Sequence, residues 1–276
     1  MRFSLNSLAA RHPSASTASA PALKPLSIEV AAGEQVAVIG PSGSGKTTLL
    51  HALACALRPA AGALTLAGTD PWHLSTSALQ TLRGQLFLAP QAPPLPPRQR
   101  VITAVLAGRL PRQSLGASLR SLFYPTGIAE AEAALARFDL AQKLWDRVDR
   151  LSGGERQRVG LARALVSGAS LWLIDEPLSS LDPTRAALAI DSLTAAAKER
   201  GATLITTLHQ VDVATRFPRV VGLRNGKLHF DLPAAEVTHA RLAELYAQHE
   251  HELTGAAPVQ ADPPPTPAQP VVMHCR

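Results

Sequence analysis

A glycine-rich loop between an apolar run and a helical pattern is the feature that most constrains the fold of this chain. Residues 40–48 read Gly-Pro-Ser-Gly-Ser-Gly-Lys-Thr-Thr and match the pattern G-x-x-x-x-G-K-[ST] at every position. The run 35–39 before the loop predicts a buried parallel strand, and the leucines after it recur at helical spacing and predict a helix that continues to Leu57. A surface loop rich in glycine and serine is the alternative, which the flanking strand and helix disfavour. The order strand, loop, helix predicts an α/β fold around a parallel sheet.

The residue types of this loop suit the phosphates of a nucleotide triphosphate. Glycines let backbone N–H groups turn inward around an anion, and a helix that begins directly after the loop points its positive end at the same anion. Lys46 would place a cation on the β- and γ-phosphates, and the Thr47 hydroxyl would bind Mg²⁺. The expected contacts to the nucleotide come from Gly40, Pro41, Ser42, Gly43, Ser44, Gly45, Lys46, Thr47 and Thr48.

Composition narrows the class of protein. The 276 residues are 46% hydrophobic, and no apolar run approaches the ~18 to 20 residues of a membrane span. Since the N-terminus also lacks a signal-peptide pattern, we expect a cytosolic chain whose two cysteines, Cys55 and Cys275, are unpaired thiols. The net charge is +6, but only 4% of residues are aromatic and they are not interleaved with basic ones. This disfavours single-stranded nucleic acid as a partner and favours a basic surface near lipid headgroups.

The order of patterns predicts a sheet that is interrupted by helices. Strands are expected at 2–8, 26–30, 35–39, 63–67, 85–88, 171–174, 203–208, 220–223 and 227–230, with a loop over 12–25. Prolines between Pro90 and Pro97 exclude regular structure there, and helical patterns follow from 101 to 165. We expect one domain over residues 1–253, with its core at about 1–91 and 166–232 and a helical subdomain at about 92–165. A C-terminal helical segment would occupy about 233–253, with its helix over 239–251. The prolines beyond it predict a disordered tail over 254–276.

Two carboxylates follow the apolar run 171–174. Asp175 would hold Mg²⁺ and Glu176 would polarise the attacking water, as such pairs do near a phosphate loop in nucleotide hydrolases. An ordinary acidic turn at a strand end is the alternative. The phosphate loop upstream favours the catalytic interpretation.

Residues 151–158, Leu-Ser-Gly-Gly-Glu-Arg-Gln-Arg, resemble the signature motif of ATP-binding cassette ATPases, and they lie between the phosphate loop and the acidic strand as in that family. The resemblance implies a P-loop NTPase (RecA-like) core of α/β class with a mixed or parallel sheet, an N-terminal antiparallel β part and an inserted α-helical subdomain. It also implies an anion site at the start of a helix. Ser180-Leu181-Asp182 resembles the D-loop, and His209 resembles the switch histidine that contacts the γ-phosphate. The ATP contacts implied by these motifs are Leu151, Ser152, Gly153, Gly154, Glu155, Asp182 and His209.

Two further positions follow from the family resemblance. Gln91 is the candidate for the Q-loop glutamine that touches Mg²⁺, although Ala89-Pro90 replaces the usual lead-in, and Gln85 is the alternative. His12 aligns with the aromatic residue that stacks on adenine, and an imidazole offers less stacking area than a phenol. Stacking by another residue remains the alternative.

Segments between residues 3 and 251 resemble the ATPase subunit of phosphonate-type importers, a group that also handles phosphate and phosphite. The segments are 105–110, 120–123, 208–214, 219–223, 226–227 and 230–231. The resemblance implies that ATP hydrolysis drives uptake of a phosphonate or related phosphorus oxyanion at the cytoplasmic face of the inner membrane. Alternatives are an importer for another solute, a soluble cassette protein that acts on ribosomes or DNA, and a P-loop kinase.

The same resemblance implies a composite site with several partners. Two copies would pair head to tail, so that ATP on the phosphate loop of one copy is completed by the signature of the other. Glu176, His209 and Lys46 would be catalytic, and Thr47, Gln91 and Asp175 would hold Mg²⁺. Residues 91–110 would dock an integral membrane permease, which in turn receives solute from a binding protein, and no nucleic acid is expected.

Overall fold

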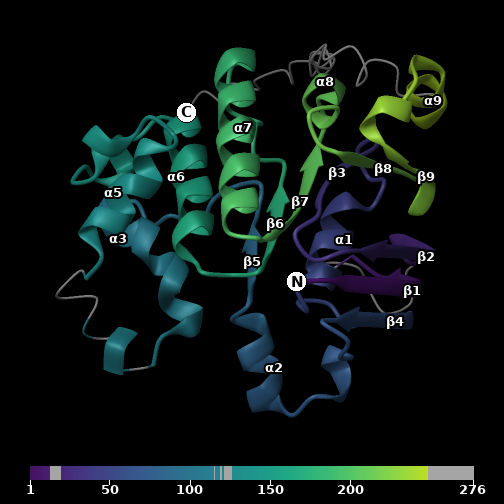
Figure 1. Cartoon of the computed structure of the whole chain (residues 1–276), viewed down its shortest axis with the longest axis horizontal. Coiled ribbons are helices and arrows are strands. Elements are labelled where there is room, and N and C mark those ends of the chain that lie inside the picture. Colours follow the sequence, from purple (N-terminus) through teal and green to yellow (C-terminus); the bar gives the residue numbers. More distant parts are fainter. Residues whose placement is uncertain (13–19, 115, 119, 121–125, 248–276) are drawn as a thin grey trace, which may run out of the picture.

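Two sheets and a group of helices build the described part of the chain, which in this computed structural model comprises residues 1–12, 20–114, 116–118, 120 and 126–247 (Figure 1). The strands are β1 (Phe3–Ala10), β2 (Leu23–Val30), β3 (Gln35–Ile39), β4 (Ala61–Leu66), β5 (Leu86–Ala89), β6 (Leu171–Asp175), β7 (Thr203–Leu208), β8 (Arg219–Arg224) and β9 (Lys227–Pro233). The α-helices are α1 (Lys46–Leu53), α2 (Thr76–Arg83), α3 (Val101–Leu106), α5 (Ile128–Ala136), α6 (Gly153–Val166), α7 (Pro183–Glu199), α8 (Val211–Ala214) and α9 (His239–Leu245). Short 3-10 helices lie at η1 (Pro71–His73), η2 (Ala107–Arg112), η3 (Ala141–Lys143), η4 (Val148–Arg150) and η5 (Ala234–Glu236).

The larger sheet has the strand order β5-β6-β7-β3-β8-β9. All neighbours from β5 to β8 are parallel, and β9 pairs antiparallel with β8. Parallel strands are joined by helices that cover both faces of the sheet, and both faces are buried here. In β3, Ala37 and Ile39 face the core that contains α6 and α7, whereas Val36 and Val38 face the core that contains α1. The sheet therefore carries two cores, one on each side.

The second sheet is antiparallel, with the order β2-β1-β4. Its inner side chains, among them Leu5, Leu26 and Leu64, belong to the same core as α1. This sheet therefore packs over the helix that follows the phosphate loop, which confirms the expected antiparallel β part at the N-terminus.

The helices α3, α5 and α6 gather at one side of the molecule, on the far side of α7 from β1, β2 and β4 (Figure 1). Leu135 and Phe138, which the spacing of apolar residues places on one face, are both buried in the core of this group. Residues 90–97 form neither helix nor strand, as the prolines predict.

Several expected boundaries were wrong. The helix after the loop ends at Leu53 rather than Leu57, because Cys55 adopts a left-handed conformation with φ of 54°. The Ala56 N–H then donates to the His51 carbonyl and the Cys55 N–H to the Ala52 carbonyl, the pattern that closes a helix. Cys55 itself is a buried free thiol, and burial raises its pKa to about 11.

Other elements differ from the expectation by a few residues or were not expected. Helix α2 lies in a stretch to which the sequence analysis assigned no element, and β2 begins at Leu23, inside the expected loop over 12–25. Within the described residues α9 ends at Leu245, and β9 extends to Pro233. Residues 121–123, 248–251, Cys275 and the tail over 254–276 lie outside the described residues. In the described part of the chain, no helix combines the length and the apolar character needed to cross a membrane.

Candidate nucleotide-binding site

The carboxyl ends of four neighbouring strands meet at one edge of the large sheet. The phosphate loop follows β3, Glu176 follows β6, His209 follows β7, and Gln91 lies two residues after β5. Ligands of open α/β sheets bind at this edge. A cavity of about 410 Å³ lies there, lined by His12, Ala22, Ser42, Gly43, Ser44, Gly45, Lys46, Thr47, Thr48, Gln91, Glu176 and His209.

The loop is bent so tightly that glycine is required at its start. Gly40 has φ of 151°, and a Cβ placed there would lie 2.0 Å from the Leu223 carbonyl oxygen. The Lys46 Nζ, which is buried, donates to the Gly40 carbonyl at 2.7 Å and to the Pro41 carbonyl at 3.3 Å. The Ser44 hydroxyl is also buried, and among the described residues it has no hydrogen-bond partner. An oxyanion in the cavity would supply the acceptor that this hydroxyl lacks.

Three titratable side chains, Glu176, His209 and Lys46, converge on the cavity. The Glu176 Oε1 lies 2.5 Å from the His209 Nε2 and 4.0 Å from the Lys46 Nζ. Burial raises the pKa of the Glu176 carboxyl, but the hydrogen bond to His209 and the positive charges of His209 and Lys46 outweigh burial and hold the pKa below its usual value. Glu176 is therefore a carboxylate at neutral pH, which suits a group that orients a water molecule.

Asp175 is the last residue of β6, directly before Glu176, and is almost fully buried, with 5% of its surface exposed. Its Oδ1 accepts a hydrogen bond of 2.6 Å from the Thr207 hydroxyl. Thr47 and Gln91 line the cavity. Mg²⁺ prefers one or two carboxylates and substrate phosphate oxygens, so this set of oxygen donors fits the ion. Among the described residues no group of three or more His, Cys, Asp or Glu side chains is placed to hold a metal ion.

The candidates at two open positions, Gln91 and His12, both line the cavity, and their roles stay predictions. Gln91 lines the cavity, whereas Gln85 lies before β5 and its carbonyl accepts hydrogen bonds from Ser170 and Leu171. His12 lines the cavity with the phosphate loop, although adenine stacking by it stays a prediction.

The signature residues are not brought to this cavity, and its described lining includes none of residues 151–155. Ser152 instead caps α6: its hydroxyl accepts from the Glu155 N–H at 3.2 Å, and the Ser152 N–H donates to the Glu155 Oε2 at 2.8 Å. This hydrogen bond from the Ser152 N–H lowers the pKa of the Glu155 carboxyl. Gly153 and Gly154 pack against the D-loop, where a Cβ on Gly154 would lie 2.9 Å from the Ser180 carbonyl oxygen. Leu151 is buried in the core of the helical group.

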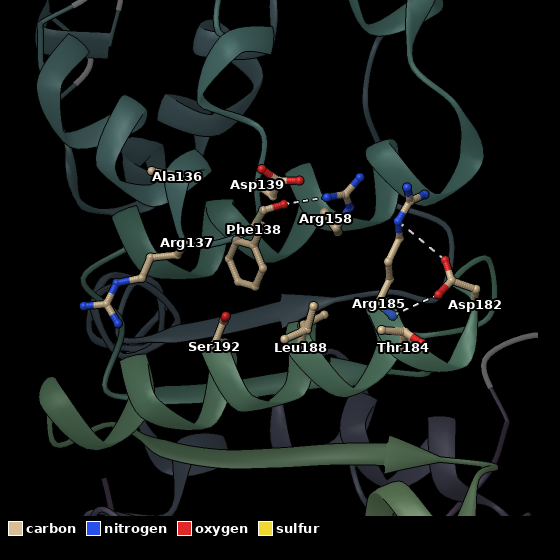
Figure 2. Close-up of a pocket in the computed structure, with 11 residues that line it drawn as sticks. Ala136, Arg137, Phe138, Asp139, Arg158, Asp182, Thr184, Arg185, Leu188 and Ser192 are labelled. Carbon is tan, nitrogen blue, oxygen red and sulfur yellow. Dashed lines mark hydrogen bonds and ion pairs between the residues drawn. The ribbon is translucent and has the colours of Figure 1, made fainter.

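Asp182 also lies away from the phosphate cavity. It caps α7 by accepting a hydrogen bond of 3.0 Å from the Arg185 N–H. Asp182 lines a second cavity of about 600 Å³ between α7 and the end of α5, into which Phe138, Leu188 and Ser192 point (Figure 2). In one chain, the signature and the D-loop are therefore neighbours of each other and not of the phosphate loop.

Two residues that fix this site, Thr207 and Gln157, were not predicted from the sequence. The Thr207 hydroxyl accepts from the Glu176 N–H at 2.9 Å as well as donating to Asp175. Gln157, on α6, donates to the Gln91 and Glu176 carbonyls. The threonines in the buried strand β7 could have indicated a polar role for Thr207. Gln157 is one of several polar residues in α6, and only the fold shows which carbonyl groups its side chain contacts.

Comparisons with known proteins agree with this geometry. Residues 23–179 match the model of the ABC transporter family. The chain is 68% identical over all of its length and that of the relative to "Phosphonates import ATP-binding protein PhnC 2" of Albidiferax ferrireducens. It is 66% identical, with the same full coverage, to "Phosphonates import ATP-binding protein PhnC" of a Polaromonas species. A third relative, "Phosphonates import ATP-binding protein PhnC 1" of Pseudomonas aeruginosa, is 51% identical over 92% of each chain.

Solved structures show the same fold. The dimeric ATP-binding cassette MJ0796 in a post-hydrolysis state, bound to ADP and Pi, has a TM-score of 0.72 and 25% identity over 84% of this chain and 98% of that one. The cassette cbiO1 from Clostridium perfringens has a TM-score of 0.72 over 89% and 94% of the two chains, and at 22% identity it supports the fold alone. The phosphate loop, the carboxylate and the histidine meet at the edge of a sheet that these cassettes share, and the chain belongs to the ABC transporter family of ATPases.

Proposed function

We propose that this chain is the ATP-hydrolysing subunit of an importer for phosphonates or related phosphorus oxyanions. The convergence of Lys46, Glu176 and His209 on one cavity carries the ATPase part of the proposal. The names of the relatives, which cover the whole chain at 66% and 68% identity, support phosphonates as the solute. The solute itself would meet the partner proteins and not this chain.

In the proposed site Lys46 and the loop N–H groups bind the β- and γ-phosphates, and the Ser44 hydroxyl donates to a phosphate oxygen. Thr47, Asp175 and Gln91 would hold Mg²⁺, which neutralises phosphate charge when bound. Glu176 would orient the attacking water through its carboxylate, and His209, which lies beside it, would contact the γ-phosphate. His12 would stack on the adenine.

The site is half of a composite site. Residues 151–155 lie outside the phosphate cavity of their own chain, so we infer that they complete the cavity of a second copy, with the start of α6 directed at its γ-phosphate. The solved relative MJ0796 is a dimer bound to ADP and Pi, which supports this pairing. Closure on ATP and reopening after hydrolysis would then move a membrane permease that binds near residues 91–110, and would place the chain at the cytoplasmic face of the membrane.

The replacement Glu176→Gln tests the catalytic role. It keeps the size of the side chain and its ability to hydrogen-bond, but it removes the charge that polarises water. We expect ATP affinity within about threefold of the wild type and turnover reduced by at least about a hundredfold. Glu29→Gln, at an exposed carboxylate outside the cavity, is the matched control. Turnover by Glu176→Gln equal to that of the control would refute the assignment.

The solute is tested in cells. A strain without the gene should fail to grow with a phosphonate as its phosphorus source and should still grow on phosphate supplied at high concentration. The wild-type gene should restore growth and Glu176→Gln should not. Normal growth of the deletion strain on phosphonates would refute the solute, and purification of the chain without a membrane subunit from native membranes would refute its role in import.

A further inference from the structure

The side chain of Gln157 lies where the signature helix meets the catalytic edge of the sheet. It is 5% exposed and belongs to α6, whose first turn carries the signature. Its amide Nε2 donates to the Gln91 carbonyl at 3.0 Å and to the Glu176 carbonyl at 3.2 Å. One buried amide therefore spans the main chain of two candidate site residues that are far apart in the sequence.

Other contacts along the same face of α6 hold the segment after Gln91. Gly160 lies one turn after Gln157, and a Cβ placed on it would lie 2.9 Å from the Pro93 Cγ. One turn further, the Arg163 Nη1 donates to the Pro94 carbonyl at 3.4 Å. Residues at such spacing share one face of a helix. The segment 91–94 therefore lies along α6, and Gln157 fixes the end of that segment nearest the cavity.

The main chain of Glu176 is held from both sides. Its φ of 44° is in the left-handed region, which a residue with a side chain adopts only when its surroundings enforce it. The Thr207 hydroxyl accepts from its N–H at 2.9 Å, and Gln157 donates to its carbonyl. With both main-chain groups bonded, the carboxylate is directed at His209 and Lys46.

We propose that Gln157 is a positioning residue that links the ATP site of its own chain to the signature helix. Its two donor hydrogens keep Gln91 and Glu176 at a fixed place relative to α6. Because the first turn of α6 is the part that would complete the ATP site of a second copy, the contact joins the two sites of a dimer through one side chain. The inference rests on the proposed roles of Glu176 and Gln91.

Gln157→Met tests the link in the full-length chain. Methionine keeps the length and the helix propensity of glutamine but donates no hydrogen bond, so both carbonyls lose their partner. We expect kcat for ATP to fall roughly tenfold to a hundredfold, the usual effect of removing a residue that orients a catalytic group. The dissociation constant for ATP should stay within about threefold, because Gln157 does not line the cavity. Gln142→Met, at an exposed glutamine elsewhere in the helical group, is the control for the substitution itself.

Gln157→Lys separates positioning from packing, because lysine retains a donor at similar reach. It should keep kcat closer to the wild type than Gln157→Met does. If Gln157→Met does not fold, kcat of the folded Gln157→Lys is compared with kcat of Gln142→Met, and a loss of about a hundredfold in Gln157→Lys would overturn the inference. A kcat for Gln157→Met within twofold of Gln142→Met would overturn the inference, as would a folded Gln157→Lys as inactive as Gln157→Met. ATP turnover by Glu176→Gln is measured in the same experiment. If Glu176→Gln hydrolyses ATP, the result counts against the proposed function. If Glu176→Gln is inactive and Gln157→Met is active, the result counts only against the role of Gln157.

Discussion

At the scale of single residues, Glu176, the proposed catalytic carboxylate, shows how neighbouring residues set the pKa and the orientation of a side chain. Burial alone raises its pKa, and the adjacent His209 and Lys46 reverse that effect. The left-handed backbone at this position is maintained by hydrogen bonds from other elements. The charge and the direction of this side chain therefore depend on four residues from three separate segments of the chain.

The lowered pKa predicts a dependence of stability on pH. Since the pKa of Glu176 in the folded protein lies below its ordinary value of 4.5, the ionised carboxylate stabilises the fold above that value, and this stabilisation is lost as pH falls through the lowered pKa. Glu176→Gln does not titrate. The free energy of unfolding, measured with urea, should therefore fall less between about pH 5 and pH 3 in this variant than in the wild type. Parallel curves for Glu176→Gln and the wild type would contradict the prediction.

A second prediction concerns the adenine. His12 lies in the wall of the cavity, and a phenol in its place would offer a larger face for stacking. His12→Tyr should bind ATP roughly threefold more tightly, as judged by nucleotide titration, and should bind free triphosphate no better than the wild type. Equal ATP affinity in the two proteins would show that another residue stacks on the adenine.

At the scale of elements, the first turn of α6 combines a helix cap with a proposed nucleotide contact. The capping box between Ser152 and Glu155 stabilises the start of the helix. The same hydroxyl is the group that we propose for contact with the nucleotide of a second copy. Ser75 provides a comparison, because its hydroxyl caps α2 by accepting from the Ala78 N–H at 3.3 Å and it lies away from both cavities.

The two caps predict different outcomes for the same substitution. Ser152→Ala and Ser75→Ala should each lower the free energy of unfolding by about 1 kcal/mol, because each loses one capping bond. Only Ser152→Ala should lower ATP turnover, by about tenfold or more. Turnover that falls equally in the two variants would show that Ser152 acts through stability alone.

At the scale of the whole molecule, the phosphate loop and the signature lie in different places of one chain. Because we propose that the signature of a second copy completes the ATP site, bound ATP should drive the pairing of two copies. Glu176→Gln with ATP and Mg²⁺ should elute at about twice the 29.1 kDa of one chain, because the nucleotide stays unhydrolysed between two copies. The double variant that also carries Ser152→Arg should remain at the mass of one chain, because the bulky, positively charged arginine side chain would occupy the place of the serine hydroxyl. Light scattering after size exclusion measures both, and a Glu176→Gln protein that stays single with ATP would contradict the pairing.

The sequence by itself determined the elements whose pattern is local. The loop over 40–48, the continuous apolar runs of β3 and β6, and the signature at the start of α6 are each contained in a short run, and the phosphate loop and the acidic pair Asp175 and Glu176 were located from such runs alone. Boundaries set by distant contacts or by an unexpected backbone conformation were not predictable in this way. The end of α1 at a left-handed Cys55 is one example, since cysteine is not a usual residue for that conformation.

The tertiary structure alone decided which of these runs share a site. The order β6-β7-β3 brings Glu176, His209 and the phosphate loop to neighbouring strand ends, although they lie far apart in the sequence. It also leaves the signature and Asp182 outside that cavity, and it places the amide of Gln157 between Gln91 and Glu176. Hydrogen bonds and ion pairs act over a few ångströms, so they depend on the packing of strands and helices and not on separation along the chain. A sequence can therefore identify the chemistry of each segment, while the sheet decides which segments act together.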